Sequence, residues 1–169
     1  DSITATGGTV TGGNVIFYST GISLAFVSVS HEDSPALTAQ GVDEEGTFEI
    51  VFDVTAFGSD IYIPDVSSTT AAAAGTAVGS DIDLTTGSIT ATSLATDIKS
   101  DGTDSGAGLL VSKSNTQRFT VTTTLTATEG SADNVFVALA GLGWATSNTT
   151  TAGGLYSFDL AEYVAGPAH

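Results

Sequence analysis

Hydrophobic and polar residues alternate along much of this chain with a period of two. The clearest run lies within residues 43–64, "DEEGTFEIVFDVTAFGSDIYIP". Four apolar residues fall on one side of it: Phe48, Ile50, Phe52 and Val54. The other side carries Glu49, Asp53 and Thr55. This alternation predicts a β-strand with one side in a core and the other in water.

Turn residues around this run predict where the strand begins and ends. The acidic stretch 43–46 predicts a turn before it, and Gly58 with Ser59 predicts a change of chain direction after it. Residues 61–63 then predict a second, short strand. Pro64 lacks a backbone donor, so we expect it to end that pairing.

A similar run follows at residues 118–128. Its apolar side is expected to hold Phe119, Val121, Thr123, Leu125 and Ala127. The two runs align as Phe-x-Ile-x-x-x-Val-Thr-Ala and Phe-x-Val-x-x-x-Leu-Thr-Ala. This likeness fits either a weak internal duplication or two strands in equivalent positions that converged on one solution. Further strands are predicted at residues 2–6, 9–11, 14–19, 22–29, 81–85, 88–94, 108–112, 134–140 and 154–160. Segment 66–79 is predicted to be a loop with room for one short helical turn.

Short strands separated by Gly, Ser, Asn and Asp predict an all-β fold. We expect an immunoglobulin-like antiparallel β-sandwich with Greek-key connections and about seven to ten strands. Residues 14–169 are expected to form this single domain. Residues 1–13, "DSITATGGTVTGG", stand apart because two Gly-Gly pairs flank Thr-Val-Thr. They are either an ordinary first strand or an arm that adds to a neighbouring subunit's sheet edge through Ile3, Ala5 and Val10.

Charge narrows the range of partners. The chain has 19 Asp and Glu residues against 3 Lys and Arg residues, which gives a formal net charge of −16 at pH 7. Such a chain repels phosphate backbones and anionic lipid, so we expect neither nucleic acid nor a membrane surface as a partner. No apolar run reaches the roughly 18 to 20 residues of a membrane-spanning helix.

Other absences from the composition point to export. The sequence contains no Met, and its first residue is Asp. The absence of Cys excludes a disulfide framework and does not decide the compartment. We expect a mature chain left after removal of a signal peptide, extracellular or at a cell surface, without a disulfide framework. The 3 basic residues also leave few sites for trypsin-like proteases.

Candidate catalytic groups do not assemble into a known pattern. Asp104-Ser105-Gly106 resembles protease signatures, but neither His31 nor His169 has the context of a general base. The sequence also holds no second copy that would supply the paired carboxylate of an aspartic protease. We therefore expect no enzymatic activity and no organic cofactor.

A calcium site is the one metal site that the sequence suggests. Asp97, Asp101 and Asp104 put three carboxylates into "DIKSDGTDSG", on what is predicted to be one loop. Oxygen ligands on a Gly-containing loop suit Ca²⁺, although the spacing is not that of an EF-hand. The alternative is an ordinary solvated acidic loop.

Two aromatic residues and one sequon are the remaining candidates. Trp144 in "GLGWATSN" and Tyr156 are candidate platforms for a sugar ring of a host or matrix glycan, or else packing residues. Asn148-Thr149-Thr150 has the form of an N-glycosylation site.

Two segments, residues 45–65 and 117–145, resemble those of a known domain family. The first contains Gly-Thr-Phe, Thr-Ala-Phe-Gly and Asp-Ile-Tyr-Ile, and the second contains Phe-Thr-Val and Gly-Trp. The chain resembles an uncharacterised immunoglobulin-like β-sandwich domain of predicted secreted surface proteins of candidate-phylum bacteria. The resemblance implies this fold and export, and it supplies no catalytic residues.

The sequence leaves two hypotheses for the function. In the first, the chain is a structural subunit of an extracellular filament, pilus or surface layer, and copies of the chain assemble by strand addition. In the second, it is a surface adhesin or carbohydrate-binding module that uses Trp144 and Tyr156.

Overall fold

The computed structural model describes residues 19–33, 44–65, 67–68, 77–78, 82–86, 91–106, 108–127, 137–148, 154–157 and 162–165. These residues form strands and turns and include no helix. The strands are β1 (Gly21–Asp33), β2 (Glu44–Phe57), β3 (Ile61–Pro64), β4 (Ser67–Ser68), β5 (Ala77–Val78), β6 (Ile82–Thr86), β7 (Ala91–Ser100), β8 (Gly108–Val111), β9 (Thr116–Ala127), β10 (Val137–Trp144), β11 (Gly154–Ser157) and β12 (Val164–Ala165). The protein is therefore all-β in its described part.

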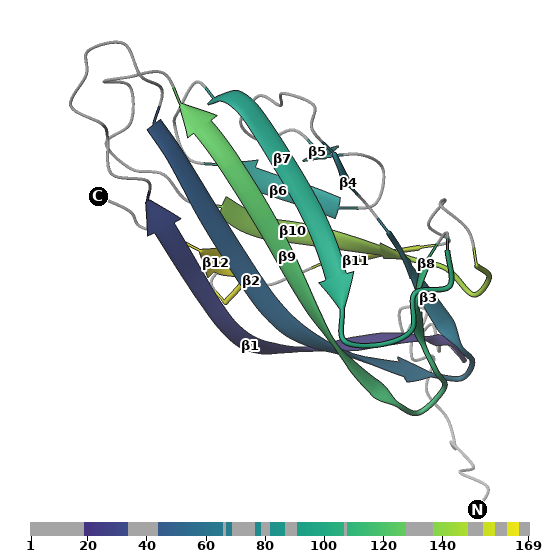
Figure 1. Cartoon of the computed structure of the whole chain (residues 1–169). Coiled ribbons are helices and arrows are strands. Elements are labelled where there is room, and N and C mark those ends of the chain that lie inside the picture. The colour runs from purple at the N-terminus through teal and green to yellow at the C-terminus, as the bar shows by residue number, and fades with distance from the viewer. Residues whose placement is uncertain are drawn as a thin grey trace, which may run out of the picture.

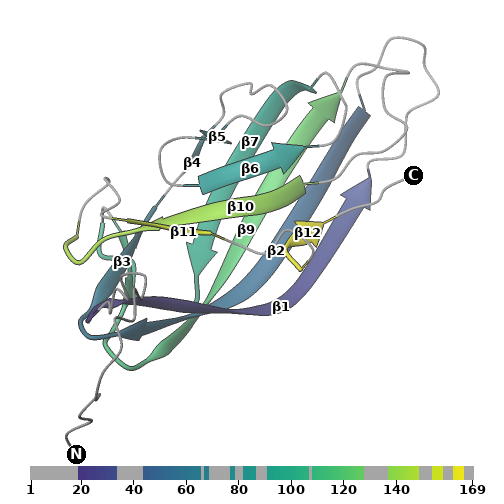
Figure 2. The ribbon, with the colours of Figure 1, turned by 180° about the vertical axis from the view of Figure 1, so that it is seen from behind.

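The strands form antiparallel sheets. The first sheet has the order β1-β2-β9-β7-β4, and the second has the order β11-β10-β6-β5 with β12 also on β10. A third sheet pairs β3 with β8. In Figure 1 the long strands of the first sheet run diagonally in front, and β6 and β10 cross behind them; Figure 2 shows the reverse.

Within the described residues, a β-bridge between Tyr62 and Ala145 attaches the third sheet to the second. The Tyr62 amide donates to the Ala145 carbonyl over 2.8 Å, and the Ala145 amide donates back to the Tyr62 carbonyl over 2.9 Å. β3 thereby continues beside the end of β10, and it pairs with β8 instead of folding back on β2. The chain does change direction at Gly58, which has a φ of 85°.

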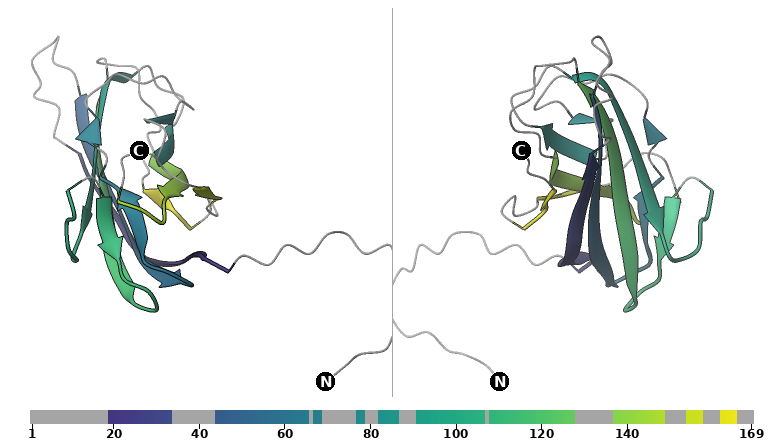
Figure 3. Two further views of the ribbon diagram at one scale, coloured as in Figure 1. Left: turned by 90° about the vertical axis from the view of Figure 1, so that its right-hand side faces the viewer. Right: turned by 60° about the vertical axis from the view of Figure 1, so that its left-hand side comes forward.

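The core lies between the first and second sheets, which form two layers in Figure 3. The prediction for the first alternating run is confirmed, because Phe48, Ile50, Phe52 and Val54 are all buried. They belong to one cluster with Leu139 and Leu142 of β10 and Ala165 of β12. On β9, Phe119, Val121 and Thr123 are buried as expected, whereas the side chains of Leu125 and Ala127 lie outside the described part.

The two alternating runs are direct neighbours. β2 and β9 pair antiparallel from Glu44↔Ala127 to Thr55↔Thr116, which places Phe52 opposite Phe119. The two similar sequence patterns therefore belong to adjacent strands of one sheet, whose apolar residues face the same core.

Several predicted boundaries differ from the structure. Glu44, Glu45 and Gly46 belong to β2 and pair with β9, so the predicted turn at 43–46 is wrong for these three residues. β7 extends to Ser100, well beyond the predicted strand 88–94. The predicted loop 66–79 contains the two-residue strands β4 and β5, and β12 was not predicted. The predicted strands at 2–6 and 9–11, and residues 14–18, lie outside the described residues.

Candidate interaction edge

β1 is an edge strand of the first sheet. It pairs with β2 along its length, and no described residue forms a ladder on its other side. Its first ten residues, Gly21–Ser30 with the sequence GISLAFVSVS, contain no charged side chain. We call this stretch, together with Phe57, the β1 edge. An edge of this kind presents unpaired backbone donors and acceptors that another strand can use.

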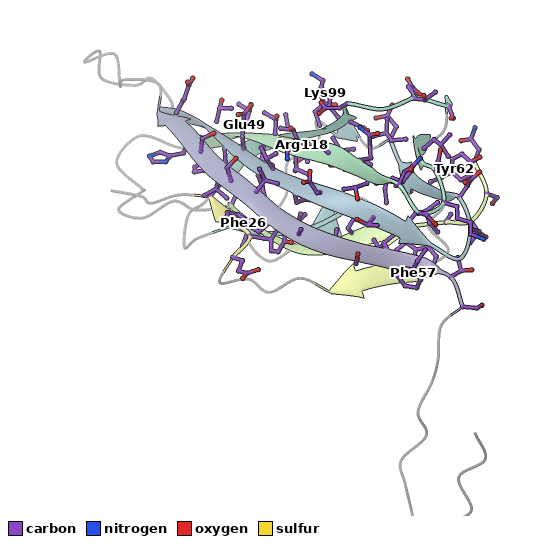
Figure 4. All side chains as sticks on the ribbon, turned by 90° about the horizontal axis from the view of Figure 1, so that it is seen from below. Phe26, Glu49, Phe57, Tyr62, Lys99 and Arg118 are labelled. Carbon is purple, nitrogen blue, oxygen red and sulfur yellow. The ribbon has the colours of Figure 1, made fainter. Side chains whose placement is uncertain are left out.

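Core-facing residues of β1 become more exposed from Ile22 to Phe26. Register pairs Ile22 with Ala56 and Phe26 with Phe52, which places both β1 residues on the core side of the sheet. Ile22 is 4% exposed, but Phe26 is 39% exposed. In Figure 4 Phe26 lies on the opposite side of the sheet from Glu49 and Lys99. Between Ile22 and Phe26, solvent therefore reaches the core side of β1 chiefly at Phe26.

Phe26 also links the edge to the second sheet. Its ring meets that of Tyr163 edge-on, with 5.7 Å between ring centroids, and Tyr163 meets Phe52 in the same manner at 6.0 Å. Tyr163 directly precedes β12, and it is 4% exposed. Phe26 is thus the outer end of an aromatic row that begins in the core.

A β-bulge follows Phe26. The register with β2 shifts between Phe26 and Ser28, so Val27 is the extra residue, and its side chain is 36% exposed. A bulge interrupts pairing and increases the local twist of an edge strand. It therefore separates the β1 edge into a part before Val27 and a part after it.

Phe57 covers the beginning of β1. A Cβ atom added to Gly21 would lie 2.7 Å from Phe57 Cζ, so the aromatic ring occupies the space that a side chain at position 21 would need. Phe57 is itself 41% exposed. Among the described residues, the exposed large hydrophobic side chains are Phe26, Val27 and Phe57. Phe26 and Val27 lie on β1, and Phe57 of β2 pairs with Gly21 at the start of β1.

The opposite edge of the same sheet has a different character. Among the described residues, β7 pairs on this side with the two residues of β4, and it carries Asp97 and Lys99, whose side chains form an ion pair at 3.1 Å. The Lys99 side chain is 77% exposed. Charged residues, Lys in particular, are a common protection of sheet edges against unwanted pairing. The β1 edge has no such charge before His31.

The outer face of the first sheet is polar. Arg118 on β9 donates to both carboxylate oxygens of Asp53 on β2, over 2.9 Å and 3.1 Å. These hydrogen bonds lower the pKa of Asp53 below its ordinary value, against a smaller opposing effect of desolvation. Thr55 and Thr116 share a hydrogen bond of 2.7 Å on the same two strands.

The predicted calcium ligands do not share one loop. Asp97 lies in β7 and pairs with Lys99, whereas Asp101 and Asp104 follow that strand. Asp104 Oδ1 accepts a hydrogen bond of 2.7 Å from the Gly106 amide. The described residues contain no group of three or more His, Cys, Asp or Glu placed to hold a metal ion. The prediction of a single acidic loop is wrong because Asp97 continues the β7 strand.

Two of these carboxylates, Asp97 and Asp104, influence the nearby Asp65. Desolvation raises the pKa of Asp65 above its ordinary value, and the negative charges of Asp104 and Asp97 raise it further.

The predicted glycan-contact residues lie on neighbouring strands. Trp144 is the last residue of β10 and pairs with Gly154 of β11. Tyr156 of β11 pairs with Leu142 of β10. Trp144 is partly buried and packs against the core cluster, whereas the side chain of Tyr156 lies outside the described part. Asn148 is exposed, and its side-chain nitrogen donates to the Ser105 carbonyl. The arm residues Ile3, Ala5 and Val10 lie outside the described residues.

Sequence reasoning did not single out Phe26, Val27 and Phe57. One signal was present: Phe26 and Val27 are consecutive large apolar residues in a strand that otherwise alternates, and the structure has its bulge there. Phe57 gave no signal, because its proximity to Gly21 depends on the pairing of two strands.

Comparison with known proteins identifies no relative. No protein-family model, no curated protein and no solved structure matches this chain. The structure therefore shows an antiparallel, mostly-β domain, and the family resemblance seen in the sequence remains a prediction. Within the described part, no helix has the length and apolar character needed to cross a bilayer.

Proposed function

We propose that the chain is an exported structural subunit of an extracellular filament, pilus or surface layer, whose copies assemble by β-strand addition. We further propose that its sheets form an immunoglobulin-like sandwich with Greek-key connections. One observation carries the function: the β1 edge is uncharged and exposes Phe26 and Val27 in a chain of formal charge −16.

Charge supports contact between copies at this edge. Two molecules of charge −16 repel each other when acidic surfaces meet. Contact along Gly21–Ser30 brings no carboxylate of this stretch to the interface. Strand addition there also pairs the free backbone groups of the edge and covers the exposed part of Phe26.

The positions of the basic residues suit an extracellular environment. Lys99 and Arg118 lie in strands, and Lys113 lies in the short connection between β8 and β9. A trypsin-like protease requires an extended, accessible segment, so strand positions are protected while the sheet is intact.

Electron microscopy of the purified chain tests the proposal. We expect filaments or sheets that form more readily as salt rises from about 10 mM to about 150 mM, because screening weakens the repulsion between copies. Deleting residues 1–13 should abolish the assemblies. A chain that stays monomeric at high concentration at every salt concentration contradicts the proposal.

The adhesin alternative is not favoured by the position of Trp144. Its side chain packs against the core cluster, which is the arrangement expected of a structural residue. Binding to a glycan array that is lost in Trp144→Ala, with unchanged thermal unfolding, would favour that alternative.

A further inference from the structure

We infer that the part of the β1 edge before the bulge, Gly21–Phe26, is the acceptor for residues 2–6 of a second copy. In this arrangement Ile3 and Ala5 of the incoming strand lie beside Phe26 on the core side. The inference rests on the proposed function and specifies which edge and which segment make the contact.

The free edge and the exposed core residue coincide on Gly21–Phe26. Ile22 and Phe26 face the core, Ser23 and Ala25 face outward, and Phe26 remains 39% exposed. A strand added beside β1 places its own core-facing side chains next to Phe26. The added strand therefore extends both the hydrophobic core and the hydrogen-bonded ladder of the first sheet.

The sequence of residues 2–6, Ser-Ile-Thr-Ala-Thr, has the matching pattern. Ile3 and Ala5 alternate with Thr4 and Thr6, which gives one apolar side and one polar side at the period of a strand. The polar side would continue the outer face, where Thr55 and Thr116 already lie. This is the longest uninterrupted alternation within residues 1–13, because Gly-Gly pairs follow it.

The bulge sets the length of the acceptor. Before Val27, the six residues Gly21–Phe26 of β1 can pair with an added strand, which is enough for a strand of five residues. After the bulge the edge runs into His31, Glu32 and Asp33. A second acidic chain is less favourable there because of charge repulsion.

Chain length permits contact with a neighbour. Residues 1–18 precede the described part, and Gly21 begins β1 almost directly after them. At roughly 3.3 Å per extended residue, residues 7–18, which connect the proposed donor strand to the described part, span up to about 40 Å, comparable to the roughly 43 Å of the 13-residue β1. The segment is therefore long enough to leave its own domain and reach the same edge of the next copy.

Cysteine pairing provides a direct test, since the chain contains no native Cys. Thr4→Cys and Ala25→Cys place single thiols on the outer side of the proposed donor and acceptor strands. Mixed under mild oxidation, the two variants should give a disulfide-linked dimer of the two different chains. Thr4→Cys mixed with Lys99→Cys, which carries its thiol on the opposite edge, is the matched control and should give none.

A second pair of variants tests the donor side. Ile3→Asp should raise the critical concentration for assembly at least about tenfold, because a carboxylate would be buried beside Phe26 without a partner. Thr4→Asp, one residue along and on the polar side, should change it far less. Equal effects of the two variants would overturn the assigned orientation.

The outcomes separate this inference from the proposed function. Assemblies that form without a Thr4–Ala25 cross-link, or with a Thr4–Lys99 cross-link, overturn the acceptor assignment and leave the structural role intact. A monomeric chain at every concentration overturns both. A variant carrying both Thr4→Cys and Ala25→Cys that forms an internal disulfide as a monomer shows that the segment closes its own edge, which also overturns both.

Discussion

The rings of Phe52 and Phe119 lie nearly parallel across the β2–β9 pair, with 6.0 Å between ring centroids and 12° between ring planes. Both side chains are fully buried, and the two residues stand directly opposite each other in the register. The stack lies in the centre of the first sheet and contributes the two largest fully buried side chains of the described core.

Phe52→Ala should therefore lower the free energy of unfolding by about 3–5 kcal/mol, since it removes a buried aromatic ring and leaves a cavity. Val51→Ala changes the next residue along, whose side chain is on the other face of β2 and partly exposed, and should have less than about 1 kcal/mol effect. Urea denaturation of both variants measures the difference. Similar losses for the two would contradict the assignment of faces.

Gly58 should tolerate substitution less well than Gly106. Both have positive φ angles, 85° and 94°, so an alanine is strained at either position. A Cβ atom on Gly58 would also collide with the Ser19 carbonyl oxygen and lie 2.7 Å from Thr20 Cα, whereas Gly106 has nothing within 4 Å.

We accordingly expect about 1–2 kcal/mol of destabilisation for Gly106→Ala and a clearly larger loss for Gly58→Ala. Thermal unfolding of the two variants compares them. If Gly58→Ala were the milder change, the close approach of the β2–β3 turn to the residues before β1 would be wrong.

Asp65 should destabilise the fold slightly at neutral pH. Its pKa is raised above the ordinary value of 3.8, first by desolvation and then by Asp104 and Asp97. The folded state therefore holds the Asp65 proton more tightly than the unfolded state does, and this relative stabilisation is lost as pH rises above 3.8 through the raised pKa.

Asp65→Asn should consequently stabilise the protein at pH 7, by no more than about 0.5 kcal/mol because the side chain is exposed. The gain should disappear near pH 3, where the carboxyl group is protonated in both states. Urea denaturation at the two pH values provides the measurement. A gain that is larger at pH 3 than at pH 7 would reverse the sign of the argument.

Trypsin should cut the native chain first after Lys113, and slowly. Lys113 lies in the connection between β8 and β9, where its amide donates to Asp60 Oδ1 over 2.8 Å and Ser114 has a φ of 64°. Lys99 and Arg118 lie within strands.

Mass spectrometry during limited proteolysis should show fragments 1–113 and 114–169 as the first products. Lys113→Gln should extend the lifetime of the intact chain. First cleavage after Lys99 would instead mean that β7 opens more easily than the connection.

The sequence predicted the faces of β2 and β9 because a buried strand has few ways to satisfy a core on one side and water on the other. It did not predict that Phe52 meets Phe119, since alternation specifies a face and gives no partner. It placed Asp97 in a loop because the stretch "DIKSDGTDSG" contains several Asp, Ser and Gly residues, whereas β7 continues through Asp97 to Ser100.

The candidate site was less predictable than the fold. Phe26 has the spacing of a core residue, but it lies on the edge strand β1 and is 39% exposed, whereas Ile22 of the same strand is 4% exposed. Trp144 was a candidate for ligand binding on the basis of residue type, but the structure packs it against the core cluster. In both cases the exposure of an aromatic side chain depends on strand order, which local sequence does not encode.

The pairing of β2 with β9 has a consequence for how the molecule reaches its folded state. Asp53 and Arg118, which pair across these strands, are separated by 65 residues, so the central contacts form only after a long loop has closed. Domains dominated by such non-local contacts fold in milliseconds to seconds, far more slowly than helical bundles. A newly made chain is therefore expected to remain unfolded far longer than a helical bundle of similar length would.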